Sequence, residues 1–236
     1  MRTLFGMLCA AVLSVGMVDA SNAWQITAND LTDGASNVDL GFATATAGPR
    51  PFEHKTFNKN GQSFTGVGIE GGFVGGEIDI NGDEYIQLDI VEATKISEIT
   101  IGFLFENGNH HDEVDEIAVV DYWDMQGTMY TATLSVNHVL TGLSATWSGT
   151  GSASNVPGFA GVQDKGGLWQ IINPFGDMVV SKMKFRANND QSDTVVRNEG
   201  SDYVLVSVNV PEPSTVLLLG GGLLALVGFG RKYMKK

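Results

Sequence analysis

Short stretches in which apolar and polar residues alternate recur along this chain. Between residues 84 and 90, Ile86, Leu88 and Ile90 fall on one side of an extended backbone and polar residues on the other. The same period of two appears in later segments, which predicts half-buried β-strands. The predicted strands cover residues 24–27, 38–44, 52–58, 62–69, 77–80, 84–90, 95–105, 114–123, 128–136, 143–147, 168–172, 178–187 and 202–210.

Turn-forming residues separate these stretches. Asn60-Gly61 is suited to a two-residue hairpin turn, and Asn81-Gly82-Asp83 marks a second turn. Residues 148–167 are rich in Gly and Ser and predict one long loop, and residues 188–200 predict a second polar loop.

Helical patterns are scarce between these strands. The chain contains 30 glycines among its 236 residues and has few runs of strong helix formers. Many short strands without intervening helices indicate an antiparallel β-sandwich, which we expect to be jelly-roll-like. We expect one such domain over residues 24–209.

The first 23 residues have the layout of a secretory signal peptide. A positive start at Arg2 precedes an apolar stretch over 4–18, and small residues follow it at Ala20 and Ala23. We expect cleavage after Ala23, because the mature chain would then open on a strand at residue 24. Cleavage after Ala20 is the alternative.

Cys9 is the only cysteine, and it lies within the predicted signal peptide. The mature chain would therefore have no disulfide, no thiolate metal site and no cysteine nucleophile. An exported domain of this kind has to rely on its apolar core and on any bound cations.

The body of the chain is strongly acidic. Residues 24–210 contain nine Lys and Arg against 25 Asp and Glu, a formal net charge of −16. Such a surface repels polyphosphates, so nucleic acid is not an expected partner.

The last 27 residues, 210–236, form three consecutive parts. Residues 210–215 read Val-Pro-Glu-Pro-Ser-Thr, residues 216–230 are apolar, and residues 231–236 are mostly basic. The apolar part predicts a membrane-spanning helix. This helix would be short, because a bilayer core needs about 20 apolar residues and the segment has fewer. The basic end places the C-terminus in the cytoplasm.

This order of parts resembles the PEP-CTERM sorting signal. The resemblance implies recognition by an exosortase, a membrane-embedded processing enzyme of Gram-negative bacteria, with Pro211, Glu212 and Pro213 as recognition residues. It also implies export across the inner membrane, membrane anchoring before processing, and a final place at the cell surface or in extracellular polysaccharide. The bodies of such proteins vary too much for the resemblance to imply their task.

One acidic cluster predicts a cation site. Carboxylate oxygens are the ligands that calcium prefers, and His110 and His111 precede the cluster. A solvated acidic turn between two strands is the alternative reading. The candidate calcium ligands are Asp112, Glu113, Asp115 and Glu116. A second candidate group consists of Asn81, Asp83 and Glu84.

Aromatic residues offer a second candidate chemistry. Exposed tryptophans on a sandwich can stack against sugar rings, although aromatic residues in sandwiches are also frequent in the core. The candidate stacking residues are Trp123, Trp147 and Trp169, with Tyr122 and Phe175 nearby in the sequence.

We find no catalytic motif in the sequence and expect no enzyme. The composition and the tail favour an exported structural or adhesive protein associated with exopolysaccharide. A carbohydrate-binding module or a secreted glycan-active enzyme on the same tail is the alternative.

The calcium hypothesis makes a thermal prediction. If the acidic cluster binds calcium, EDTA lowers the melting temperature of the folded body, because a ligand that binds only the folded state stabilises it. Differential scanning calorimetry with and without EDTA measures the shift. Identical melting curves with and without EDTA would refute the calcium hypothesis.

Overall fold

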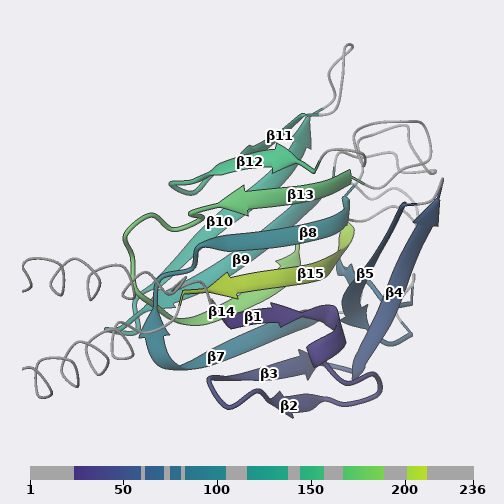
Figure 1. Cartoon of the computed structure of the whole chain (residues 1–236), viewed down its shortest axis with the longest axis horizontal. Coiled ribbons are helices and arrows are strands. Elements are labelled where there is room, and N and C mark those ends of the chain that lie inside the picture. The colour runs from purple at the N-terminus through teal and green to yellow at the C-terminus, as the bar shows by residue number, and fades with distance from the viewer. Residues whose placement is uncertain are drawn as a thin grey trace, which may run out of the picture. The chain divides into compact units, whose positions relative to one another are not determined.

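The computed structural model consists of two antiparallel β-sheets packed face to face (Figure 1). The strands between Gln25 and Val210 belong to one compact unit. The structure describes residues 24–59, 62–71, 75–80, 83–104, 116–137, 144–156, 167–188 and 201–211.

The first sheet lies nearest the viewer in Figure 1 and has eight described strands. Six of them are adjacent in the order β12-β13-β8-β15-β5-β4, while β1 and β6 also pair with β15. Their bounds are β1 Trp24–Thr27, β4 Phe52–Lys59, β5 Gln62–Ile69, β6 Ile78–Asp79, β8 Glu98–Leu104, β12 Ser152–Asn155, β13 Gly167–Ile172 and β15 Asp202–Val210.

The second sheet has seven described strands in the order β11-β10-β9-β14-β7-β3-β2. One short 3₁₀ helix, η1 Ala28–Asp30, follows β1. The bounds of the strands are β2 Asn37–Asp39, β3 Ala43–Gly48, β7 Tyr85–Thr94, β9 Ile117–Asp124, β10 Met129–Asn137, β11 Ser144–Trp147 and β14 Val180–Ala187.

The predicted fold class is confirmed at the level of two antiparallel β-sheets. The jelly-roll-like order stays a prediction; a simple jelly roll has eight strands in two Greek keys. The described part of this chain has fifteen strands, and hairpins such as β4–β5 and β12–β13 stay within one sheet.

The core lies between the two sheets. In β7, Ile86, Leu88 and Ile90 are all buried, as the alternation of the sequence predicts. Met183 and Phe185 of β14 are also buried, and they lie opposite Tyr122 and Val120 in the register with β9. Burial of large apolar side chains contributes about 1.5–3 kcal/mol each and accounts for most of the stability of such a sandwich.

Strand β15 connects more of the fold than any other described strand. It pairs with β8, β5, β6 and β1, although it is the last strand of the chain. Its Tyr203 is fully buried, and the phenolic hydroxyl donates to the backbone carbonyl oxygens of Arg186, at 3.1 Å, and Val119, at 3.4 Å. Both acceptors belong to the second sheet, so one hydroxyl links the two layers.

Two segments differ from their predicted form. The predicted strand 38–44 is split into β2 and β3, because Gly41 adopts a positive φ of 81° and its N–H donates to the Asp39 carboxylate. The predicted loop 148–167 contains strand β12, whose residues pair with β13. Small polar residues, which suggested a loop, form an edge strand here.

The predicted signal peptide, with Ala20 and Ala23, lies outside the described residues, and so does the apolar segment 216–230. Within the described part of the chain, no helix is long and apolar enough to cross a membrane.

The Tyr203 hydroxyl makes a stability prediction. Tyr203→Phe should lower the free energy of unfolding by about 1–2 kcal/mol, because a buried hydrogen bond is lost without a replacement by water. Urea denaturation of the full chain measures the change.

Tyr130→Phe is the matched control. Its hydroxyl donates to Asp124 at 3.3 Å from an exposed position, so the same chemical change should alter the free energy by less than about 0.5 kcal/mol. Equal effects of the two substitutions would contradict a special role for Tyr203.

Candidate functional site

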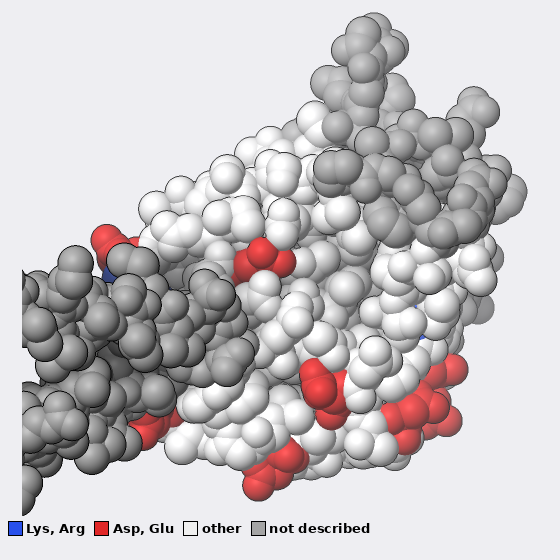
Figure 2. Space-filling view, viewed as in Figure 1, with Lys and Arg blue, Asp and Glu red and all other residues white. Residues whose placement is uncertain are grey.

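Three cations point outward from one strand of the second sheet. In β14, Lys182, Lys184 and Arg186 alternate with buried residues, so all three lie on the outer face. They are three of the nine basic residues in the strongly acidic body. Figure 2 shows that the face with the first sheet is mostly uncharged where it is described, with scattered acidic groups.

Each cation of β14 contacts a side chain of a neighbouring strand. The ammonium group of Lys182 lies 4.1 Å from the ring centroid of Trp123, and that of Lys184 lies 4.0 Å from the ring centroid of Tyr85. Arg186 donates from Nε to Asp121 at 2.7 Å. A cation over an aromatic ring gains about 0.5–1 kcal/mol at an exposed site, which is enough to favour one orientation of a long side chain.

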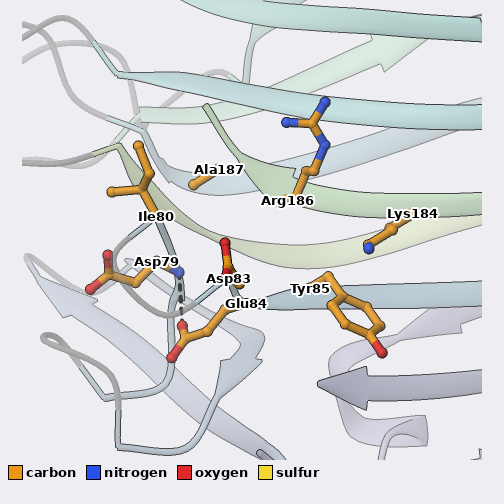
Figure 3. A pocket seen from close by; sticks show the side chains of 8 residues that line it. All are labelled: Asp79, Ile80, Asp83, Glu84, Tyr85, Lys184, Arg186 and Ala187. Atoms are coloured by element: carbon orange, nitrogen blue, oxygen red, sulfur yellow. Dashed lines mark hydrogen bonds between the residues drawn. The ribbon is translucent and has the colours of Figure 1, made fainter. Parts of the chain in front are cut away.

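A pocket of about 320 Å³ opens at one end of this row. Figure 3 shows Lys184 and Tyr85 on one side of it, Asp79 and Glu84 on the other, and the Asp83 side chain between them. Asp83 adopts a positive φ of 50° in the turn that precedes β7, and its side chain is exposed. The complete lining consists of Asp79, Ile80, Asp83, Glu84, Tyr85, Lys184, Arg186 and Ala187.

Glu84 is buried and fixed at the base of this turn. One carboxylate oxygen forms an ion pair with Arg50, and the other accepts the backbone N–H of Asp79 at 2.9 Å. Burial raises the pKa of Glu84 above its ordinary value of 4.5, although the hydrogen bonds from Asp79 and Arg50 act in the opposite direction. Both oxygens are occupied, so Glu84 positions the turn and is not free to bind a ligand.

The pocket therefore combines three kinds of contact. Asp83 offers an exposed carboxylate that accepts hydrogen bonds, Lys184 offers an ammonium group that binds an anion, and Tyr85 offers an aromatic ring. A small polar ligand with hydroxyl groups and a negative charge fits this set, and the volume lies near the lower end of the range for ligand pockets.

The predicted stacking residues are not brought together. Trp169 is only 2% exposed and Trp147 only 7% exposed, so neither presents a ring face to a bound sugar. Both belong to the core, where the Trp147 indole N–H donates to the carbonyl oxygen of Pro174. Tyr122 and Phe175 are buried too, with ring centroids 4.0 Å apart. Trp123 remains as a half-buried ring on the outer face.

The predicted calcium ligands are described only at Glu116. Its side chain is fully buried, and its carboxylate accepts the backbone N–H of Asp202 at 3.3 Å. Asp112, Glu113 and Asp115 lie outside the described residues, as do His110, His111 and Asn81. Within the described part of the chain, no group of three or more His, Cys, Asp or Glu side chains is placed to bind a metal ion.

The cation row is a feature that sequence reasoning did not single out. The pattern Lys182-Met183-Lys184-Phe185-Arg186 is visible in the sequence, and alternation alone places the three cations on one face. Their neighbours Tyr85 and Trp123 come from other strands, so only the register of the sheet reveals the site.

Residues 209–232 match the family model of the PEP-CTERM protein-sorting motif. The chain thus carries a PEP-CTERM motif. None of the curated proteins and none of the solved structures matches the chain significantly.

The PEP-CTERM motif confirms the resemblance found in the sequence. It implies processing by an exosortase and a destination at the cell surface or outside the cell. The match begins at Asn209, inside β15, where Val210 is fully buried and Pro211 is half-buried. The motif therefore starts without a linker at the end of a central strand. Glu212 and Pro213 lie outside the described residues.

The raised pKa of Glu84 predicts how the stability of the body depends on pH. The folded state binds the Glu84 proton more tightly than the unfolded state, so the free energy of unfolding falls as pH rises from about 4.5 through the raised pKa. Glu84→Gln removes this titration. The stability of the native chain relative to Glu84→Gln should therefore be greater at pH 4 than at pH 7.

Urea denaturation at the two pH values measures this difference. Glu92→Gln, which changes an exposed carboxylate in the β7 strand that follows Glu84, controls for the loss of one negative charge. A native advantage over Glu84→Gln that stays constant or grows toward pH 7 would contradict the assignment.

Proposed function

We propose that this chain is an exported cell-surface or extracellular-matrix protein with a structural or adhesive role in exopolysaccharide. The observation that carries the proposal is the PEP-CTERM motif at residues 209–232, joined directly to a compact β domain. The motif directs export and processing, and the β domain is the part of the protein that acts at the cell surface after processing.

The proposed route begins at the inner membrane of a Gram-negative bacterium. A signal peptide over residues 1–23 directs the body across the membrane, and the apolar segment 216–230 retains the chain there. The basic residues of 231–236 stay in the cytoplasm. An exosortase then processes the chain near Pro211, Glu212 and Pro213 and releases the body toward the surface.

The proposed role of the body is non-catalytic. The pocket contains carboxylates, as a glycan-active enzyme would require, but both oxygens of Glu84 are occupied by Arg50 and the Asp79 backbone. In Figure 3 the Asp79 carboxylate points away from Lys184 and Tyr85. Only Asp83 has an exposed side chain among the three acids, and a pair of carboxylates is needed for general acid–base hydrolysis of a glycoside.

One observation favours the alternative role of a carbohydrate-binding module. The row on β14 places cations over aromatic rings on an outer sheet face beside a pocket. This arrangement specifies how the body would attach to extracellular material, and it is compatible with the adhesive role.

Deletion of Pro211–Pro213 tests the sorting proposal. The deletion should leave the body folded, because the removed residues follow the last strand, while the protein no longer reaches the cell surface. Cell fractionation with surface labelling measures its location.

The melting temperature of the deletion variant is the control for folding. A variant that melts like the native chain but stays in the membrane supports the proposal. Surface delivery equal to that of the native chain would refute the sorting role of these residues.

A further inference from the structure

Building on the proposed role in exopolysaccharide, we propose that the outer face of β14 and the adjoining pocket bind an anionic polysaccharide made of uronic acid units. Lys182 and Lys184 bind the carboxylates of the polymer, Tyr85 and Trp123 contact its sugar rings, and Asp83 accepts hydrogen bonds from its hydroxyl groups.

The charge distribution is the first step. A polyanion is repelled by a body with a net charge of −16, so it can approach only where cations are concentrated. The described cations of β14 form such a row, with about 7 Å between alternate residues of a strand. Spacing of this kind suits a ligand that repeats a negative charge along its length.

The local partners decide which cations are available. Arg186 is engaged by Asp121, from its Nε to Oδ2 at 2.7 Å and from its Nη2 to Oδ1 at 3.3 Å. Among the described residues, Lys182 and Lys184 form no ion pair within 4 Å; each lies over an aromatic ring. Asp89 stands opposite Lys182 in the register with β7; its carboxylate keeps its charge and accepts a hydrogen bond from the Gln87 amide at 2.7 Å. The two lysines are therefore the groups that would bind an anion.

The aromatic rings provide the second kind of contact. Tyr85 lines the pocket beside Lys184, and Trp123 lies under Lys182, two strands away on the same face. Each ammonium group already lies over the face of its ring, so the carboxylate of a sugar can reach the ammonium group while the C–H groups of the sugar contact the edge of the ring. Neither ring has to leave its position in the sheet.

The acidic wall of the pocket selects among anions. Asp83 is the one exposed carboxylate among the three acids that line the pocket, and its negative charge repels the multiple charges of a phosphate. A uronic acid carries one charge and several hydroxyl donors, so it can present its carboxylate to Lys184 and its hydroxyls to Asp83. A volume of about 320 Å³ suits one small unit of a longer chain.

Binding of the full chain, solubilised in detergent, to polygalacturonate tests the inference, with dextran as the neutral polymer and polyphosphate as the competing polyanion. The native chain should bind polygalacturonate and not dextran, and added salt should weaken binding because the contacts are screened. Lys182→Gln with Lys184→Gln should reduce the affinity by about tenfold or more.

Lys95→Gln is the matched control. Lys95 is an exposed lysine that forms a surface ion pair with Asp177, and neither residue belongs to β14 or lines the pocket, so its loss should change the affinity by less than about twofold. Melting curves of all variants exclude unfolding as the cause. The inference is overturned by no binding of the native chain, by equal binding of dextran or polyphosphate, or by an equal loss in Lys95→Gln.

The binding result is independent of the sorting result. If the native chain reaches the surface but does not bind polygalacturonate, only the proposed ligand is refuted. A native chain that binds polygalacturonate but never leaves the membrane refutes the proposed function and leaves the site intact.

Discussion

The hydrogen bonds of Tyr203 link the two sheets directly, inside a core whose stability comes mostly from apolar burial. This buried hydroxyl belongs to β15 of the first sheet and donates to carbonyl oxygens of β14 and β9 in the second. Burial keeps the pKa of Tyr203 well above its ordinary value, so the phenol stays a donor at all physiological pH values. Because β15 also pairs with β8, β5, β6 and β1, the first sheet is completed only when the end of the body has been synthesised.

The same bond connects the core to the proposed binding face. The carbonyl that Tyr203 reaches at 3.1 Å belongs to Arg186, whose side chain points to the opposite side and binds Asp121. The backbone of β14 is thus fixed from within, while its lysines are positioned from outside by Tyr85 and Trp123. The two lysines therefore keep defined orientations, Lys182 toward β9 and Lys184 toward β7, as a preorganised binding face requires.

Sequence alternation predicted the fold class and most strands, because period two reports directly on burial in a sheet. It failed where the backbone is irregular. Phe103 continues the alternation of Ile99 and Ile101 in the sequence, but its φ of 59° turns the ring toward Phe64 on the outer side. A bulge after Leu205 likewise places Val204 and Val208 on opposite faces. The site was harder to predict, because the Arg50–Glu84 pair joins residues that are 34 positions apart in the sequence. The sequence around the tryptophans also does not show whether their side chains are buried or exposed.

The sorting tail follows the β domain directly in the sequence. The PEP-CTERM motif begins inside β15, so the strand that completes the first sheet also leads into the sorting tail. Hydrogen–deuterium exchange of the full chain tests this central position of β15 most directly. Peptides from residues 202–210 should exchange among the slowest in the body and far more slowly than the edge strand β12. Exchange of β15 as fast as that of β12 would contradict the account.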